Sequence, residues 1–184
     1  MRRFTLPLVL TCAAVALLAL LAFGLVSQGT NSSIDAMVAR GDYPPAPNDA
    51  MALPLLGSTR TESLRDLRGK VVLVNVFASW CVQCAQEASA LQQAQRMLTR
   101  QDGTVLGVTY LDNSGDDETF MRTYHLTYPV LRDVSGAFAR GLGTTGVPES
   151  FVINRGGRIQ ALRRYQLNSQ WVRQTLPRIL AEPS

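Results

Sequence analysis

The feature that most constrains the fold of this 184-residue chain is a cysteine pair, Cys81 and Cys84, between a buried strand and a helix. The β-branched run KVVLVNVFA, residues 70–78, predicts a strand of buried character that begins just after a turn glycine. Residues 82–100 predict a helix, because small and apolar side chains recur along it every three or four positions. The two cysteines therefore lie where the strand ends and the helix begins.

Three uses of such a pair can be compared from the sequence. Zinc needs about four ligands, and beyond the two cysteines the domain offers one histidine, His125, which we interpret as an ordinary surface residue. A structural disulfide between Cys81 and Cys84 closes too short a loop to add much stability. A redox pair fits better, because Cys81 faces free N–H groups and the positive end of the helix dipole, which lower its pKa. We predict that Cys81 attacks a disulfide and that Cys84 resolves the product, without metal or added cofactor.

Strand-like and helix-like segments alternate over the rest of the chain. We expect a strand at 104–111, helices at 116–126 and 134–141 on either side of YPVLRD, a strand–turn–strand unit over 149–166, and a last helix over 168–180. This order predicts an α/β fold with a central mixed β-sheet flanked by helices.

The N-terminus carries a separate signal. Arg2 and Arg3 precede an apolar run from Leu6 to Val26, long enough to cross a bilayer as one helix of about 20 residues. We predict that residues 1–26 form an uncleaved transmembrane anchor, and a cleaved signal peptide is the alternative. The paired arginines favour a cytoplasmic N-terminus, which would place the rest on the periplasmic side of a bacterial inner membrane.

Between the anchor and the folded part, residues 27–50 are polar and then rich in proline, which predicts a flexible tether with an extended end. Residues 51–184 would form the catalytic domain. The chain carries 18 basic and 14 acidic residues, and two of the basic ones are Arg2 and Arg3. Because no cluster of lysine and arginine stands out in the domain, nucleic acid is a poor candidate partner.

Two segments, LRDLRGKVVLVNVFASWCVQCAQE and TTGVPESFVINRGGRI, resemble the thioredoxin superfamily. Within it, the chain is most similar to the membrane-anchored oxidoreductases of cytochrome c maturation, the CcmG/DsbE, ResA and TlpA type. The resemblance covers residues 53–181. It includes the Trp-Cys-x-x-Cys core, Asn75 where thioredoxin carries an aspartate, and an insert at DNSGDDETFMRTYHLTYPVL. It implies the thioredoxin-like fold.

The resemblance also implies roles for residues around the cysteines. The Val147–Pro148 bond would be cis and would hold the backbone of Val147 where a client peptide can pair with it. Glu87 would lie partly buried beside the cysteines, tuning their pKa and relaying protons, although a solvated helix carboxylate is the simpler interpretation. Glu149 would add to an acidic, substrate-binding rim. Trp80 could serve packing, recognition or both.

The function implied by the resemblance is reduction of a client disulfide, with apocytochrome c as the client. A membrane thiol reductant would then restore the dithiol. One departure matters: Val82 and Gln83 stand between the cysteines, where many members have proline in the second position, so the redox potential cannot be copied from relatives.

Three alternatives remain open. An oxidant or isomerase would use the same chemistry in the other direction, and the subgroup motifs disfavour it. A copper metallochaperone on this fold generally has a Cys-x-x-x-Cys pair and a distant histidine, unlike the spacing here. A thiol peroxidase usually has Pro-x-x-x-Thr/Ser-x-x-Cys, which FASWC lacks.

Overall fold

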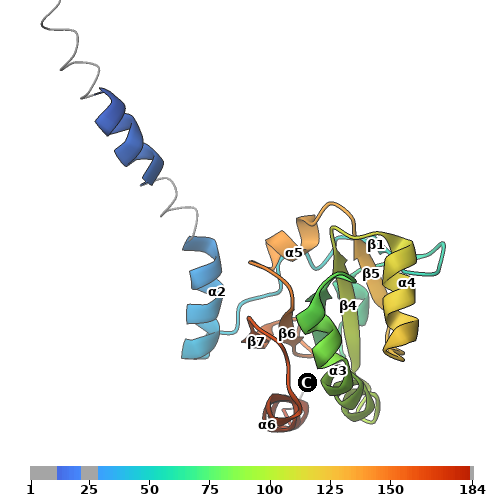
Figure 1. The fold of residues 1–184 in the computed structure, drawn as a ribbon. Helices are drawn as coiled ribbons and strands as arrows, with labels where there is room; N and C mark the ends of the chain where they lie inside the picture. The colour runs from blue at the N-terminus through green and yellow to red at the C-terminus, as the bar shows by residue number, and fades with distance from the viewer. Residues whose placement is uncertain (1–11, 22–28, 183–184) are drawn as a thin grey trace, which may run out of the picture.

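A five-stranded mixed sheet forms the centre of the protein (Figure 1). The computed structural model describes residues 12–21 and 29–182. The strand order is β5-β4-β3-β6-β7; β3, β4 and β5 run parallel, whereas β6 is antiparallel to β3 and β7 to β6. The strands are β3 (Val72–Phe77), β4 (Thr104–Tyr110), β5 (Val130–Asp133), β6 (Glu149–Ile153) and β7 (Ile159–Arg163). The α/β fold with a mixed central sheet is therefore confirmed.

Strand β3 is buried on both faces, and its side chains alternate between two hydrophobic clusters. Leu73 and Phe77 pack with residues of α3 (Val82–Thr99), α4 (Ser114–Thr123) and α6 (Ser169–Leu180). Val74 and Val76 pack on the other face with residues of α5 (Ala137–Gly141) and α2 (Gly29–Arg40). By the same alternation Asn75, between Val74 and Val76, faces α3.

A helix forms in each region where the sequence predicts one, and side-chain caps set the starts of α4 and α6. Helix α6 begins after Asn168, whose side chain accepts a hydrogen bond from the backbone N–H of Trp171. Helix α4 begins at Ser114, two residues earlier than predicted, because Asn113 caps it by accepting from the N–H of Gly115. The predicted helix 134–141 is shorter, since α5 begins at Ala137.

The segment before the sheet differs from the sequence prediction. Residues 27–50 were expected to form a flexible tether, but Gly29–Arg40 is the helix α2. The helix docks on the domain because Ile34 is buried in the core and Asp35 pairs with Arg164. Farther on, the N–H of Ala46 donates to the carbonyl of Gly157, so the proline-rich end also lies against the domain.

Three short elements that the sequence did not predict connect this segment to β3. Strands β1 (Leu53–Pro54) and β2 (Thr61–Glu62) form a small antiparallel hairpin, and the 3-10 helix η1 spans Leu64–Leu67. Each is too short to leave a periodic pattern of apolar residues.

The predicted membrane anchor, residues 1–26, falls mostly outside the described residues. Of this range the structure describes residues 12–21, which are helical. Among the residues described, no helix combines the length and the apolar character needed to span a bilayer.

Candidate active site

The cysteine pair lies at the start of α3, directly after the loop that follows β3. Cys81 is the N-cap of α3 and forms a disulfide with Cys84, with the two Cα atoms 5.2 Å apart. The Sγ of Cys81 also accepts a hydrogen bond from the backbone N–H of Cys84 at 3.1 Å. On reduction, a thiolate at Cys81 would be stabilised by this N–H and by the dipole of α3. The geometry agrees with the predicted attacking role of Cys81.

The surroundings of the pair combine buried sulfur with exposed apolar side chains. Cys81 and Cys84 are 5% and 1% exposed, whereas the neighbouring Trp80 and Val82 are 64% and 66% exposed. A large apolar surface in contact with water is available for binding another molecule. The exposure of Trp80 therefore favours recognition over packing, the question that the sequence left open.

Glu87 lies one helical turn after Cys84 on the same helix. It follows Cys84 by three residues, so the two side chains share a face of α3. It is 1% exposed, and its Oε1 accepts from Nδ2 of Asn75 at 2.8 Å while its Oε2 accepts from the N–H of Leu167 at 2.6 Å. Burial raises the pKa of Glu87 to about 7, although these two hydrogen bonds oppose the shift. The predicted burial of Glu87 is thus confirmed, and a carboxyl that titrates near neutral pH can exchange protons with nearby thiols.

Two neutral polar groups lie around this buried carboxyl, and the charge of Arg163 also acts to lower its pKa, less strongly than the hydrogen bonds from Leu167 and Asn75. Asn75 of β3 donates a second hydrogen bond to Oγ of Ser150 at 3.0 Å, across the β3–β6 pair. Tyr128 is buried, and its pKa is raised by burial and by the charge of Glu87. Neither group carries a positive charge that would hold Glu87 ionised.

Asp112 supports the loop before Cys81, and Asp117 lies close to Asp112; the sequence did not indicate that either residue belongs to the site. Oδ2 of Asp112 accepts from the N–H of Ser79, and Asp117 lies fully buried nearby on α4. Burial and the charge of Asp112 raise the pKa of Asp117 to about 7. The available signal was position: Asp112 follows β4, whose carboxyl end lies beside that of β3 because the strands are parallel.

The loop with the predicted cis bond lies next to the first turn of α3. The Val147–Pro148 peptide bond is cis, as the resemblance implied. A groove of about 460 Å³ is lined by residues of this loop together with Gln83, Tyr165 and Gln166. Pro148 is buried and Val147 half-buried, so the loop forms one wall of the groove beside the cysteines.

Glu149 does not form an acidic rim, which corrects the sequence prediction. Its side chain is 1% exposed and points into the protein. Oε1 accepts from the backbone N–H of Thr145 at 3.1 Å, and Oε2 accepts from Nη1 of Arg164 at 2.7 Å. The side chain turns inward because Glu149 pairs with Val76 of β3, on the sheet face where Val76 is buried.

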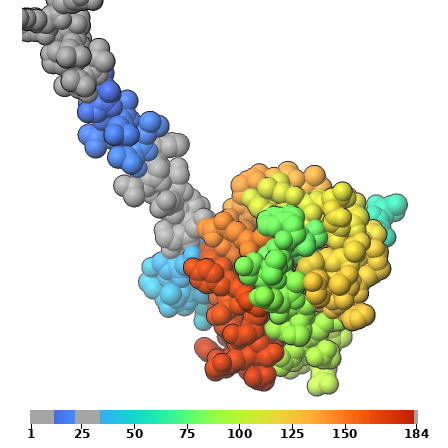
Figure 2. Space-filling model, in the orientation of Figure 1, coloured from blue at the N-terminus to red at the C-terminus, as the bar shows by residue number. Residues whose placement is uncertain are grey.

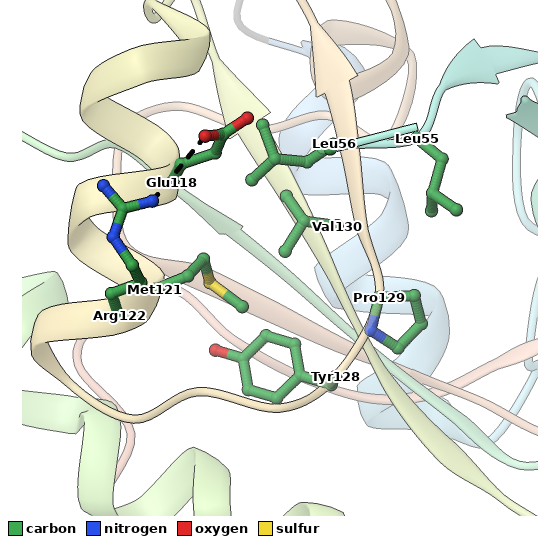
Figure 3. A pocket seen from close by; sticks show the side chains of 9 residues that line it. Leu55, Leu56, Glu118, Met121, Arg122, Tyr128, Pro129 and Val130 are labelled. Carbon is green, nitrogen blue, oxygen red and sulfur yellow. Dashed lines mark ion pairs between the residues drawn. The ribbon is translucent and has the colours of Figure 1, made fainter. Parts of the chain in front are cut away.

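A larger cavity lies apart from the cysteines. It has a volume of about 500 Å³ and apolar walls that include Leu55, Met121 and Val130, with the ion pair of Glu118 and Arg122 at its side (Figure 3). Its lining contains neither cysteine and no residue of the Val147–Pro148 loop. Across the described parts of the chain, no three His, Cys, Asp or Glu side chains are grouped as metal ligands would be.

Comparisons with known proteins agree with this site. The sequence profile of the AhpC/TSA family matches residues 45–162. The thiol:disulfide interchange protein DsbE of Xylella fastidiosa (strain Temecula1) is 32% identical over an alignment of 185 residues, which covers 98% of this chain and 90% of that protein. DsbE of Pseudomonas fluorescens biotype C is 33% identical over 115 residues, 62% of each chain.

Solved structures also include thiol:disulfide interchange proteins with a similar fold. A crystal structure assigned as the thiol:disulfide interchange protein DsbE from Chlorobium tepidum matches with a TM-score of 0.68 and 27% identity, covering 76% of this chain and 97% of that one. The fold and the cysteine pair define a thioredoxin-like thiol:disulfide oxidoreductase. The chain belongs to the AhpC/TSA family, and it is similar to thiol:disulfide interchange proteins of the DsbE type.

Proposed function

We propose that the protein is an extracytoplasmic reductant that opens the disulfide of apocytochrome c Cys-x-x-Cys-His segments during c-type cytochrome maturation. The observation that carries this proposal is the Cys81–Cys84 pair at the start of α3, with the Val147–Pro148 loop beside it. A DsbE relative that aligns with 98% of the chain supports the same subgroup. The N-terminal apolar run would hold the domain at the bacterial inner membrane, which raises its effective concentration near membrane-bound donors.

The reaction proceeds through two exchanges. The Cys81 thiolate attacks one sulfur of the client disulfide, which forms a mixed disulfide and releases the other client sulfur as a thiolate. Cys84 then loses its proton and attacks the Sγ of Cys81, which forms the Cys81–Cys84 disulfide and releases the second client sulfur. Two electrons pass to the client. A membrane dithiol donor supplies two electrons and two protons to restore Cys81 and Cys84.

The buried carboxyl and the groove would each assist one of these steps. Glu87, with a pKa of about 7, can accept the proton of Cys84 when the second exchange begins. The backbone of Val147 can pair with an extended client segment laid along the groove. Trp80 and Val82 would cover apolar client side chains next to the disulfide.

The reduction potential tests this direction of electron flow. We expect the full chain, equilibrated with thiol buffers in detergent and followed by thiol alkylation, to have a potential of about −250 mV or lower, near the value of thioredoxin. A potential of about −120 mV, where strong oxidants lie, would instead favour the oxidant alternative.

Trapping identifies the client. The variant Cys84→Ala cannot resolve the mixed disulfide, so it should retain an oxidised Cys-x-x-Cys-His peptide covalently on Cys81, and Cys81→Ser should retain none. In cells, Cys81→Ser should lower c-type cytochrome levels. Unchanged cytochrome levels together with an untrapped peptide would remove apocytochrome c as the client.

A further inference from the structure

Arg164, the residue after β7, joins three segments that lie far apart in the sequence. Its Nη1 donates to Oε2 of Glu149 at 2.7 Å and to the carbonyl of Gly143 at 2.8 Å. Its Nε and Nη2 donate to the carboxylate of Asp35 on α2, at 3.1 and 3.0 Å. The side chain of Arg164 is 16% exposed. A two-pronged contact with a carboxylate fixes the plane of a guanidinium group as well as its position.

The Glu149 end of this network controls the loop with the cis bond. Glu149 follows Pro148, and its second carboxylate oxygen accepts from both the N–H and the hydroxyl of Thr145. One buried carboxylate therefore ties the two ends of residues 145–149 together. The positive charge of Arg164 offsets the desolvation cost of burying this carboxylate. Arg164 also donates a hydrogen bond to the carbonyl of Gly143, just before the loop.

The Asp35 end connects the network to α2. Ile34 is buried in the same cluster as Phe151, and the guanidinium of Arg164 lies 5.3 Å from the centre of the Phe151 ring. Figure 2 shows the α2 segment lying against the segment that includes β7, in agreement with the contacts between α2 and β7. Helix α2 therefore holds one side of Arg164 while the loop holds the other.

We propose that Asp35 and Arg164 form a clamp through which helix α2 keeps residues 143–149 in the conformation that binds the client disulfide. Both are positioning residues that act through Glu149. The proposal rests on the proposed function, because the loop matters to activity only where a client binds beside it. It gives α2 a role beyond joining the N-terminal region to the domain.

The test uses the full chain in detergent, with the variants Asp35→Asn and Arg164→Lys. The matched control is Asp42→Asn, since Asp42 pairs with Arg40 at the exposed end of the same helix. The rate constant for reduction of an oxidised Cys-x-x-Cys-His peptide should fall roughly three- to fivefold in Asp35→Asn, the range expected for a partly exposed ion pair. The reduction potential should stay at the wild-type value, and the control should match wild type in both.

Amide hydrogen exchange provides a readout that does not depend on catalysis. The N–H of Thr145, which donates to Glu149, should exchange faster in Asp35→Asn and Arg164→Lys than in wild type or Asp42→Asn. Wild-type exchange and rates in both variants would overturn the clamp, as would an equal loss in the control or a shifted potential. If wild type fails to reduce the peptide while exchange still rises in Asp35→Asn, the clamp stands and the proposed client is wrong.

Discussion

Two glutamates lie close to the redox site, and they differ in what surrounds them rather than in how deeply they are buried. Glu87 and Glu149 are each 1% exposed. They lie on opposite faces of the sheet, since Glu87 reaches Asn75 on the α3 face while Glu149 neighbours Val76 in the register of β3 and β6. Glu149 forms an ion pair with Arg164, whereas the hydrogen bonds to Glu87 come from an amide side chain and a backbone N–H.

The partner of a buried carboxyl decides its chemical role. Without a cation in direct contact, burial favours the neutral acid, and the pKa of Glu87 rises to about 7. With a guanidinium group in direct contact, Glu149 is held in a buried ion pair that fixes the position of its side chain. Glu87 is therefore suited to move protons near the cysteines, and Glu149 to hold the shape of the loop beside them.

The largest expected effect comes from removing the cation of the Glu149 pair. Arg164→Ala leaves the Glu149 carboxylate buried without its partner, so we expect a loss of about 4 kcal/mol in the free energy of unfolding. Urea denaturation measures this loss. Adding Glu149→Gln to Arg164→Ala should recover part of it, because the orphan charge is gone.

The matched control for that change is Arg122→Ala, which removes an exposed ion pair with Glu118. It should cost no more than about 0.5 kcal/mol. A loss below about 1 kcal/mol in Arg164→Ala, or no recovery in the double variant, would show that the two buried glutamates do not differ as described.

The pH dependence of stability is the next largest effect, and Glu87 contributes to it together with Asp117. The pKa of Glu87 is raised in the folded state from 4.5 to about 7, so the folded protein binds a proton that the unfolded chain has released. The contribution of Glu87 to stability therefore falls as pH rises from about 4.5 to about 7 and then levels off, by about 3 kcal/mol in total. Glu87→Gln should show a smaller fall, as measured by urea denaturation at a series of pH values, and the fall that remains comes from Asp117, whose pKa is also raised to about 7. Parallel curves for the two proteins would argue against a neutral Glu87.

A smaller effect is expected at Asn75. Its hydrogen bond lowers the pKa of Glu87 against the larger influence of burial, so Asn75→Ala should move the titration of Glu87 to higher pH. The variant should also lose about 1–2 kcal/mol of stability, because a buried carboxyl oxygen loses its donor. Ser150→Ala, which removes the other partner of Asn75, is the control and should leave the titration of Glu87 in place. Equal shifts of the Glu87 titration in Asn75→Ala and Ser150→Ala would contradict a specific influence of the Asn75 hydrogen bond on the pKa of Glu87.

The sequence predicted the parts of this site that local patterns encode. The cysteine pair at a strand–helix junction and the apolar face of α3 each follow from residues close together in the chain. The cis bond before Pro148 and the burial of Glu87 came from family resemblance, because a single X–Pro step or one helix glutamate carries no such signal.

The remaining features depend on contacts between distant segments. Asp35 and Arg164 are 129 residues apart in the sequence, so the docking of α2 leaves no local pattern. The inward direction of Glu149 depends on its register with Val76, which only the folded sheet defines. Asp112 supports Ser79 across 33 residues for the same reason.

The most direct test of the central claim is a ¹³C NMR titration of the Glu87 side-chain carboxyl in the oxidised protein, assigned with Glu87→Gln. We expect a midpoint at a pH of about 7, in keeping with a buried carboxyl that has no cation in contact. A midpoint near 4.5, the value of an ordinary glutamate, would show that Glu87 is ionised at neutral pH and would contradict its role in moving protons beside the cysteines.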